Sequence, residues 1–342
     1  MIPSGGGSRS GLAPWAWIHY ASEVTETSRS PSIRCAPPAS LAWISVCLAP
    51  WLPAWAAPGL PPSVVAGAQL TEVYASPRLL MGPTWDPKGG RLYFVAAGRE
   101  GLGTQLLRLE SPGVATVWLD QAEGATGTCV SSDGRLLVAQ SAAHRVVSYA
   151  IGPKGPRRSR ILLEEPTLKQ PNDLVQAANG NIYFTDPDFG GGGAGGVFLL
   201  RPKGGITRLI SDMPQPNGLA LSPDGRTLYV SDSQEKLCRS FPILPNGVTA
   251  PGGRFFSPEP GSPGEPDGMG TDERGNLYLA GMGGVWVVTP AGEALGFIPV
   301  KEFCTSLTFG GPDGRDLYLA CNGRLYTLRM TVRGGFANQG VR

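Results

Sequence analysis

The stretch QPNDLVQAANGNIYFTDPDFG, residues 170–190, holds a turn between two apolar segments. Its Asn179-Gly180 dipeptide precedes a strand-like run, Asn181–Thr185, and Asn-Gly beside apolar runs is a strong β-hairpin signal. An Asn172-Asp173 pair stands a short step ahead of this hairpin. One such pair is ordinary turn chemistry, so its meaning depends on whether the pattern recurs.

The same pattern recurs along the chain, as a turn with Gly, a short spacer and an aliphatic anchor followed by an apolar run. The anchors are separated by 44, 46, 46, 49 and 40 residues, and further alternating runs follow most of them, which gives about four short strands per unit. A period of 40–50 residues with four strands is typical of a β-propeller blade. The six anchors are Leu92, Leu136, Ile182, Leu228, Leu277 and Leu317.

The repeats predict an all-β fold, a six-bladed β-propeller with four-stranded blades around a central channel. We place the propeller at residues 69–331, after a linker at 58–68 and before a C-terminal tail at 332–342. The early strand Gln69–Pro77 is expected to supply the outer strand of the last blade, because ring closure removes exposed sheet edges.

Residues 1–57 differ in composition and form a predicted leader with a signal peptide. An apolar stretch, Leu41–Leu52, is followed by Ala54-Trp55-Ala56, which fits an export signal cleaved after Ala56. The stretch is short and broken by prolines, so no membrane span is expected. We therefore expect a periplasmic or secreted protein. Because the leader is longer than an ordinary signal peptide, we also expect translation to start downstream of Met1.

The composition argues against several classes of function. The formal net charge is +2 and 16% of residues are charged, so neither nucleic acid nor an anionic membrane is an expected partner. The chain has two histidines, His19 and His144, and no C-x-x-C pair, which argues against multi-histidine and zinc sites. No G-x-S-x-G motif is present, so a Ser/His/Asp hydrolase is not expected either.

A second set of equivalent positions lies 10 or 11 residues before the anchors. Each position opens the innermost strand of its blade, so the six side chains are expected to face one another at one mouth of the channel. Short oxygen-bearing side chains converging on a point are what a hard cation such as calcium requires. The set consists of Met81, Thr126, Asn172, Asn217, Asp267 and Ser306.

The segments that carry these positions resemble the senescence marker protein/gluconolactonase/luciferin-regenerating enzyme family of six-bladed propellers. The similarity is clearest in PNDLVQAANGNIYFTDPDFG, PNGLALSPDGRTLYVSDS and PDGMGTDERGNLYLA, and it covers nearly all blades in order. The resemblance implies one divalent metal, most often calcium, near the channel axis, and hydrolysis of sugar or other small lactones. It places Asn217 and Asp267 at metal ligands and Asn172 at a contact to metal or substrate.

The chain departs from the family pattern at three of the six positions. Met81 stands where the family has a Glu ligand, and a thioether does not suit calcium. Thr126 and Ser306 replace residues that are often Asn, so we expect these three side chains to line the substrate pocket. Glu123 or Glu265 is an alternative source of the missing carboxylate.

Two functions follow from this reading. In the first, the chain hydrolyses a lactone with a metal held by Asn217 and Asp267, with Asp267 or the metal deprotonating water and Asn172 orienting the substrate. In the second, loss of the first-blade Glu leaves a metal-depleted propeller that binds a ligand or partner.

A final expectation concerns the last hairpin. Pairing Thr308 with Leu317 also pairs Cys304 with Cys321, because both sums are 625. A disulfide and two free buried thiols are both compatible with this register.

Overall fold

The computed structural model describes residues 58–98, 103–191, 193–258 and 265–335. The predicted leader, residues 1–57, lies outside the described residues, and so do Cys35 and Cys47. Within the described residues no helix is long and apolar enough to cross a membrane.

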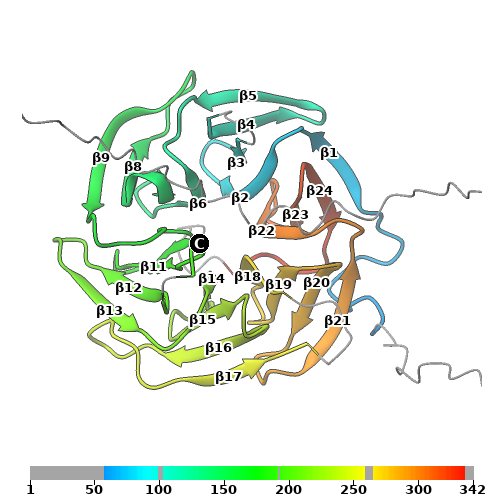
Figure 1. Cartoon of the computed structure of the whole chain (residues 1–342). Coiled ribbons are helices and arrows are strands. Elements are labelled where there is room, and N and C mark those ends of the chain that lie inside the picture. Colours follow the sequence, from blue (N-terminus) through cyan, green and yellow to red (C-terminus); the bar gives the residue numbers. More distant parts are fainter. Residues whose placement is uncertain (1–57, 99–102, 192, 259–264, 336–342) are drawn as a thin grey trace, which may run out of the picture. The chain divides into compact units, whose positions relative to one another are not determined.

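Six antiparallel sheets of four strands each surround a central channel (Figure 1), which confirms the predicted six-bladed propeller. The innermost strand of blades 1–5 comes first in sequence, and the chain then moves outward. The strands of blades 1 to 3 are β2 Leu79–Asp86, β3 Arg91–Ala97, β4 Gln105–Ser111 and β5 Val114–Leu119; β6 Ala125–Val130, β7 Arg135–Gln140, β8 Arg145–Ala150 and β9 Arg157–Glu164; and β10 Leu174–Gln176, β11 Ile182–Asp186, β12 Gly196–Leu200 and β13 Ile206–Ile210.

Blades 4 to 6 repeat this plan, and a 3-10 turn, η2 (Ser141–Ala143), joins β7 to β8 in blade 2. Their strands are β14 Pro216–Leu221, β15 Thr227–Asp232, β16 Leu237–Pro242 and β17 Gly253–Phe256; β18 Met269–Thr271, β19 Leu277–Gly281, β20 Gly284–Val288 and β21 Ala294–Pro299; and β22 Cys304–Gly310, β23 Asp316–Cys321, β24 Arg324–Arg329 and β1 Thr71–Ala75.

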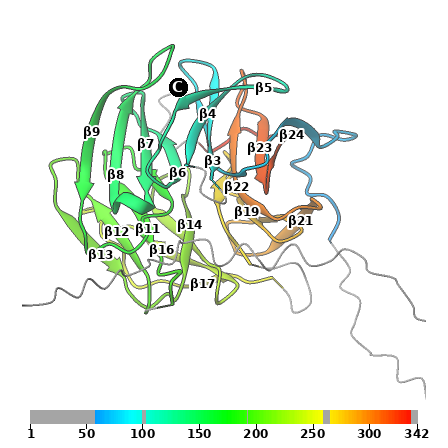
Figure 2. The ribbon, with the colours of Figure 1, turned by 45° about the horizontal axis from the view of Figure 1, so that its top comes forward.

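Blade 6 closes the ring with a strand from the start of the propeller. β1 pairs antiparallel with β24, and the register aligns Thr71 with Thr327 and Glu72 with Tyr326. The expected contribution of the early strand to the last blade is therefore confirmed. Figure 2 shows β1 and β24 side by side at the edge of the ring.

The recurring glycine turns have a common backbone reason. In all six blades the glycine between the innermost strand and the next has a positive φ, between 61° and 85°. Glycine adopts this left-handed conformation without the steric cost that a Cβ brings. These glycines are Gly90, Gly134, Gly180, Gly225, Gly275 and Gly314.

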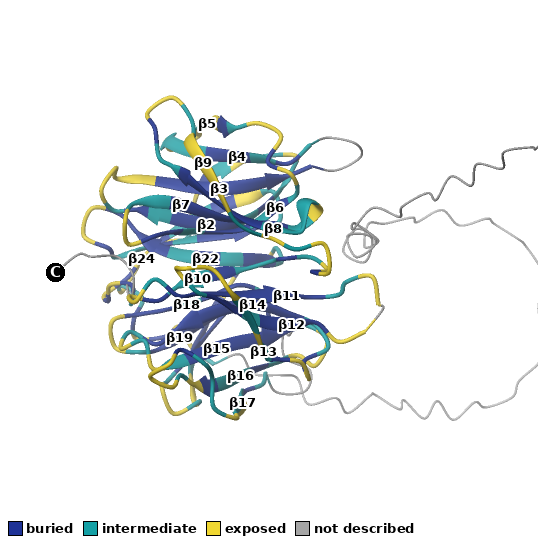
Figure 3. Cartoon of the chain, turned by 90° about the vertical axis from the view of Figure 1, so that its left-hand side faces the viewer, coloured by how far each residue is buried: buried dark blue, intermediate teal, exposed yellow. Residues whose placement is uncertain are grey.

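The core lies between neighbouring blades, because its clusters combine buried residues of two adjacent sheets. Figure 3 shows that the strands are mostly buried while many connecting loops are exposed. The residue after the anchor is a tyrosine in five blades, and four of these tyrosines are buried. Each side chain packs large apolar area against the adjacent sheet, which stabilises the radial arrangement. The buried tyrosines are Tyr93, Tyr183, Tyr229 and Tyr278.

The C-terminal segment adds to the propeller at the end of the channel away from the first residues of the inner strands. Gly335 N–H donates to the Thr271 carbonyl at 2.7 Å, and Gly334 N–H donates to Gly314 at 3.1 Å. Gly334 and Gly335 line a channel cavity of about 140 Å³, whose walls are the six inner strands. Residues 333–335 of the predicted tail are therefore hydrogen-bonded to the blades.

Candidate active site at the channel ring

The six equivalent positions lie at or just before the starts of the innermost strands. Met81 and Ser306 are third in β2 and β22, and Thr126 and Asn217 are second in β6 and β14. Asn172 and Asp267 precede β10 and β18 by two residues. We call this set the channel ring.

Hydrogen bonds join every pair of neighbouring blades at the level of the channel ring. Five of the six run between the segments that open neighbouring inner strands, and the sixth starts from Ser231 near the end of β15, so the position of each ring residue depends on its neighbours. In blade order the bonds are Thr128 Oγ1 to Gly82 O (2.6 Å), Thr126 Oγ1 to Asn172 O (2.7 Å), Asn172 Nδ2 to Asn217 Oδ1 (2.5 Å), Ser231 Oγ to Asp267 O (2.8 Å), Gly268 N to Thr305 O (2.9 Å) and Thr305 Oγ1 to Leu80 O (2.7 Å).

Asn172 and Asn217 form the polar wall of the ring. The Asn172 amide donates to Asn217 Oδ1, and the Asn217 amide in turn donates to Ser233 Oγ at 2.9 Å. Ser233 is fixed because its hydroxyl donates to the Pro266 carbonyl at 2.8 Å. This chain of bonds sets the orientation of Asn217 and leaves its carbonyl oxygen directed toward Asn172.

Asp267 continues the wall and has unusual electrostatics. Its pKa is raised well above the ordinary value, mainly by burial and next by the negative charge of Asp173. The Gly268 amide and the Asn217 side chain act in the opposite direction, because hydrogen bonds to the carboxylate favour its charged form. Asp267 is therefore a carboxyl group that holds its proton more tightly than an exposed aspartate.

Asp173 is the second carboxyl group of the site. Its two oxygens accept the Leu174 amide at 2.9 Å and the Leu219 amide at 3.2 Å, so it joins blades 3 and 4. Burial raises its pKa to about 6. The nearby Asp186 accepts the Lys169 and Gln170 amides, whereas Asp173 lines the channel cavity.

A glycine pattern could have pointed to Asp173. In four blades the residue after the ring position is glycine, at 82, 127, 218 and 268. Each approaches the next blade so closely that a Cβ would lie 2.2–2.5 Å from an atom of that blade's ring residue. Blade 3 has Asp173 at this position, and a carboxylate among these glycines marks a place where the channel accepts a side chain.

The remaining ring residues are less polar in their surroundings. Met81 is half-buried, and its main chain is held through Leu80. The Thr126 hydroxyl is engaged by the Asn172 carbonyl, so it supports the wall. Ser306 borders the channel cavity and lies against Gly268. A Cβ added at Gly268 would lie 2.4 Å from the Ser306 hydroxyl oxygen.

Neither alternative carboxylate joins Asp267. Glu265 forms an ion pair with Lys236 at 3.3 Å, and Glu123 is exposed. Across the described residues, no group of three or more His, Cys, Asp and Glu side chains is arranged to hold a metal. His144 is also committed elsewhere, since its Nδ1 lies 2.9 Å from the Leu168 carbonyl.

The six-bladed propeller is shared with related chains. The family model described as SMP-30/Gluconolactonase/LRE-like region matches residues 81–322. The chain belongs to this family. It is 30% identical to the gluconolactonase of Zymomonas mobilis over 62% of this chain and 64% of that one, so the match leaves more than a third of that relative uncovered.

Two further relatives extend the comparison. The pentonolactonase XacC of Haloferax volcanii is 29% identical over 73% of this chain and 84% of its own. A gluconolactonase structure from Xanthomonas campestris has a TM-score of 0.67 and 26% identity, over 81% of this chain and 98% of that one. A calcium-binding regucalcin from Agrobacterium tumefaciens, with a TM-score of 0.64 and 21% identity, covers 77% and 97% and shows the shared fold.

The donor set at one side of the ring fits a hard divalent cation. Asp267, Asn217 and Asn172 carry oxygen donors, and Asp173 places a second negative charge beside Asp267. Among the described residues, no basic side chain offsets the charge on either carboxyl group. A bound cation would supply that missing positive charge. The Met81 side of the ring does not fit, because a thioether is a soft ligand.

Proposed function

We propose that this chain is a lactonase that acts at the channel ring with the help of one divalent cation, calcium being the expected ion. Relatives named gluconolactonase, pentonolactonase and lactonase support a lactonase-type hydrolase. The single observation that carries the site is the pairing of Asp267 with Asp173 beside the Asn172–Asn217 amides, without a compensating basic group.

Each residue of the wall has a role in this proposal. Asn217 and Asp267 hold the cation, which when bound would polarise the lactone carbonyl as a Lewis acid. Asp267, as the carboxylate of the wall, accepts a proton from the attacking water. Asn172 donates to the substrate the amide N–H that it does not donate to Asn217, and so orients the lactone carbonyl.

The neutral part of the ring shapes the substrate pocket. In this proposal Met81, Thr126 and Ser306 line the remainder of the mouth and contact the part of the lactone remote from its carbonyl. A small lactone has no net charge, which suits a mouth without an excess of basic residues. Sugar lactones are the class named for the relatives, and they are the first substrates to test.

A second candidate function rests on Met81. Replacement of a carboxylate by a thioether weakens the attraction for a cation, so a metal-depleted propeller that binds a neutral ligand is the alternative. Hydrolysis of a lactone panel by the purified full-length chain, with added calcium and with chelator, separates the two. Turnover that chelator abolishes and calcium restores supports the lactonase, whereas a folded protein with no turnover in either condition supports the binder.

We also propose that the protein is exported to the periplasm or secreted. A disulfide between Cys304 and Cys321 supports this, because such bonds persist in oxidising compartments. The A-x-A pattern at 54–56 supplies the cleavage site. N-terminal sequencing of the mature protein is expected to begin at Ala57, and a mature chain that keeps the leader would overturn the proposal.

A further inference from the structure

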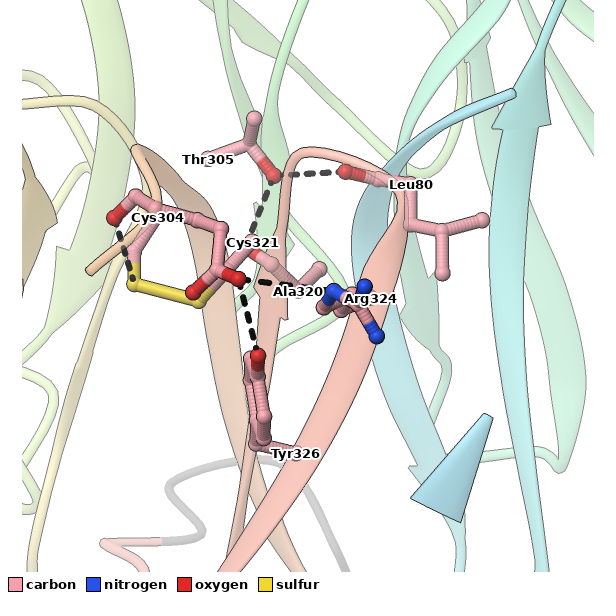
Figure 4. Close-up of a disulfide and its surroundings, with 8 residues drawn as sticks. Leu80, Cys304, Thr305, Ala320, Cys321, Arg324 and Tyr326 are labelled. Carbon is pink, nitrogen blue, oxygen red and sulfur yellow. Dashed lines mark hydrogen bonds and ion pairs between the residues drawn. A yellow bond between two sulfur atoms is a disulfide. The ribbon is translucent and has the colours of Figure 1, made fainter. Parts of the chain in front are cut away.

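A disulfide lies directly beside the channel ring. Cys304 and Cys321 pair across β22 and β23, with a Cα–Cα distance of 3.9 Å and a sequence separation of 17 (Figure 4). Both residues are fully buried. The expected register was one residue off, because Thr308 pairs with Tyr318 and not with Leu317. The irregularity between Cys304 and Ser306 restores the expected alignment of the two cysteines. Of the two states left open, a disulfide and two free thiols, the structure has the disulfide.

The residues next to the two cysteines hold the backbone of blade 1. Thr305, which follows Cys304, donates its hydroxyl to the Leu80 carbonyl at 2.7 Å (Figure 4). Asn322, which follows Cys321, accepts the Leu80 amide at 2.5 Å. Both polar groups of Leu80 are therefore fixed by neighbours of the disulfide, and Leu80 immediately precedes Met81 of the ring.

The same segment also holds blade 5. The Thr305 carbonyl accepts the Gly268 amide at 2.9 Å, and Gly268 immediately follows Asp267. Thr305 thus contacts the chain beside two ring residues, one on each side of blade 6. Its hydroxyl also lies 3.1 Å from the Ala320 carbonyl, one residue from Cys321.

The β22–β23 ladder is irregular where Thr305 lies. Cys304 pairs with Cys321 and Ser306 pairs with Ala320, so Thr305 is an unpaired bulge residue. A bulge interrupts the hydrogen bonds of a ladder and leaves its strand less firmly held. The disulfide is the covalent link at the end of this strand, beyond the bulge.

We propose that the Cys304–Cys321 disulfide is a positioning element of the channel ring, which fixes Thr305 and through it the backbone beside Met81 and Asp267. Its catalytic consequence rests on the proposed lactonase function. In the oxidised chain Thr305 is held against both neighbouring blades. Without the bond, the start of β22 is tied by hydrogen bonds alone, and the two sides of the ring separate more often.

The test begins with peptide mass spectrometry of the full-length protein without reductant, which is expected to find the peptides of Cys304 and Cys321 linked. The Cys304→Ala/Cys321→Ala variant is then compared with Cys238→Ala, which removes a buried free thiol on β16, the third strand of blade 4. Loss of a crosslink over this separation is expected to lower Tm by roughly 10 °C. The Cys238→Ala variant should keep the exchange rates and kcat of the wild type.

Hydrogen exchange supplies a reading that does not depend on activity. In the double variant the Leu80 and Gly268 amides are expected to exchange at least about tenfold faster, while the Asn172 amide, bonded to the Thr185 carbonyl, keeps its rate. If the wild type hydrolyses lactones, kcat should fall about tenfold with KM changed by less than about threefold. A uniform rise in amide exchange across all blades would show that the disulfide only stabilises the whole fold, and it would overturn the proposal.

Two results decide the remaining cases. If the double variant does not fold, the wild type is reduced in its folded state by dithiothreitol, which breaks the S–S bond, leaves a thiol on each cysteine and becomes a cyclic disulfide. Exchange at Leu80 and Gly268 is then measured in the same way, with the same expectation. If the wild type lacks lactonase activity but loss of the disulfide still speeds exchange at Leu80 and Gly268, the proposed function fails and the positioning role stands. Free thiols at Cys304 and Cys321 in the purified protein overturn the positioning role. Unchanged exchange at Leu80 and Gly268 after loss of the disulfide overturns it as well.

Discussion

The side-chain amide of Asn172 donates a hydrogen bond of 2.5 Å to the Asn217 carbonyl oxygen. The two residues are 45 positions apart and occupy the same place in consecutive blades. This bond turns the Asn217 side-chain oxygen of blade 4 toward the Asn172 amide of blade 3 and connects the polar wall that ends at Asp267. Substitution of either residue is therefore expected to disturb the position of the other.

Asp267 is the residue whose loss should be most damaging to catalysis. Asp267→Asn keeps the size of the side chain but removes the proton acceptor, so we expect kcat to fall by about 10²–10⁴-fold. Tm should stay near that of the wild type, because the change also removes the repulsion from Asp173. Glu235→Gln, at an exposed position of the β15–β16 loop, is the matched control. Retained turnover in the Asp267→Asn variant would contradict the role of Asp267 as proton acceptor.

Asp173 should set the pH dependence of activity. Its negative charge raises the pKa of Asp267, so Asp173→Asn lowers that pKa. Activity that needs a deprotonated Asp267 should then persist to lower pH, and the acidic limb of the kcat/KM profile should move down the pH scale. Profiles of both proteins in metal-buffered solution check this. An acidic limb that moves upward or stays in place contradicts it.

Asp173 also makes stability depend on pH. Burial raises its pKa from 3.8 to about 6, so the folded chain holds this proton more tightly than the unfolded chain does. The resulting stabilisation is fully present below pH 3.8 and is lost as pH rises through about 6. Urea unfolding between pH 4 and 7, with chelator, should show a decline that is weaker in Asp173→Asn. Identical slopes for the two proteins would rule out this contribution.

Restoring a carboxylate at Met81 should strengthen cation binding. One more unit charge at ~4 Å in an effective dielectric of ~20 contributes ~4 kcal/mol before desolvation, equivalent to roughly a thousandfold in Kd. Met81→Glu is therefore expected to bind calcium tighter by up to that factor in calorimetric titration. Met81→Gln has the same shape without the charge and should gain far less. Equal affinities in the two variants would show that Met81 does not face the cation.

The glycine contacts around the ring give a steric prediction. A Cβ on Gly127 would lie 2.5 Å from the Asn172 carbonyl oxygen and 2.7 Å from Asp173 Oδ1, so Gly127→Ala must displace the polar wall. We expect a loss of about 1–3 kcal/mol in the free energy of unfolding, together with reduced kcat. Gly253→Ala places its Cβ where no atom lies within 4 Å and should behave like the wild type. Urea unfolding and lactone kinetics of both variants test the prediction, and a neutral Gly127→Ala would contradict it.

Much of the fold could be predicted from local patterns. Gly180 and the five equivalent glycines recur along the chain because each hairpin requires a residue with a positive φ. This requirement can be recognised in the sequence. That Cys304 faces Cys321 was predicted from the last hairpin, although the bulge at Thr305 that shifts its register was not. Such features involve residues close in sequence, so the sequence alone predicts them.

The candidate site was predictable in part. Counting back from the anchors found Asn172, Asn217 and Asp267, because the repeats share one spacing. The placement of Asp173 was missed, since an Asp that follows Asn looks like an ordinary turn residue until the neighbouring blade brings Leu219 to its carboxylate. The orientation of Glu265 toward Lys236 was equally invisible, because it depends on two loops of different blades.

The sequence by itself determined the number of blades, their order and the residues that open each inner strand, because repeated turn chemistry and alternating hydrophobicity are local properties of the chain. The tertiary structure alone decided which carboxyl groups share a low-dielectric channel, and therefore that Asp173 raises the pKa of Asp267. It also decided that the neighbours of the Cys304–Cys321 disulfide hold Leu80 and Gly268. These relations join blades that are distant in sequence, and the electrostatic energy between two groups depends on their separation in space.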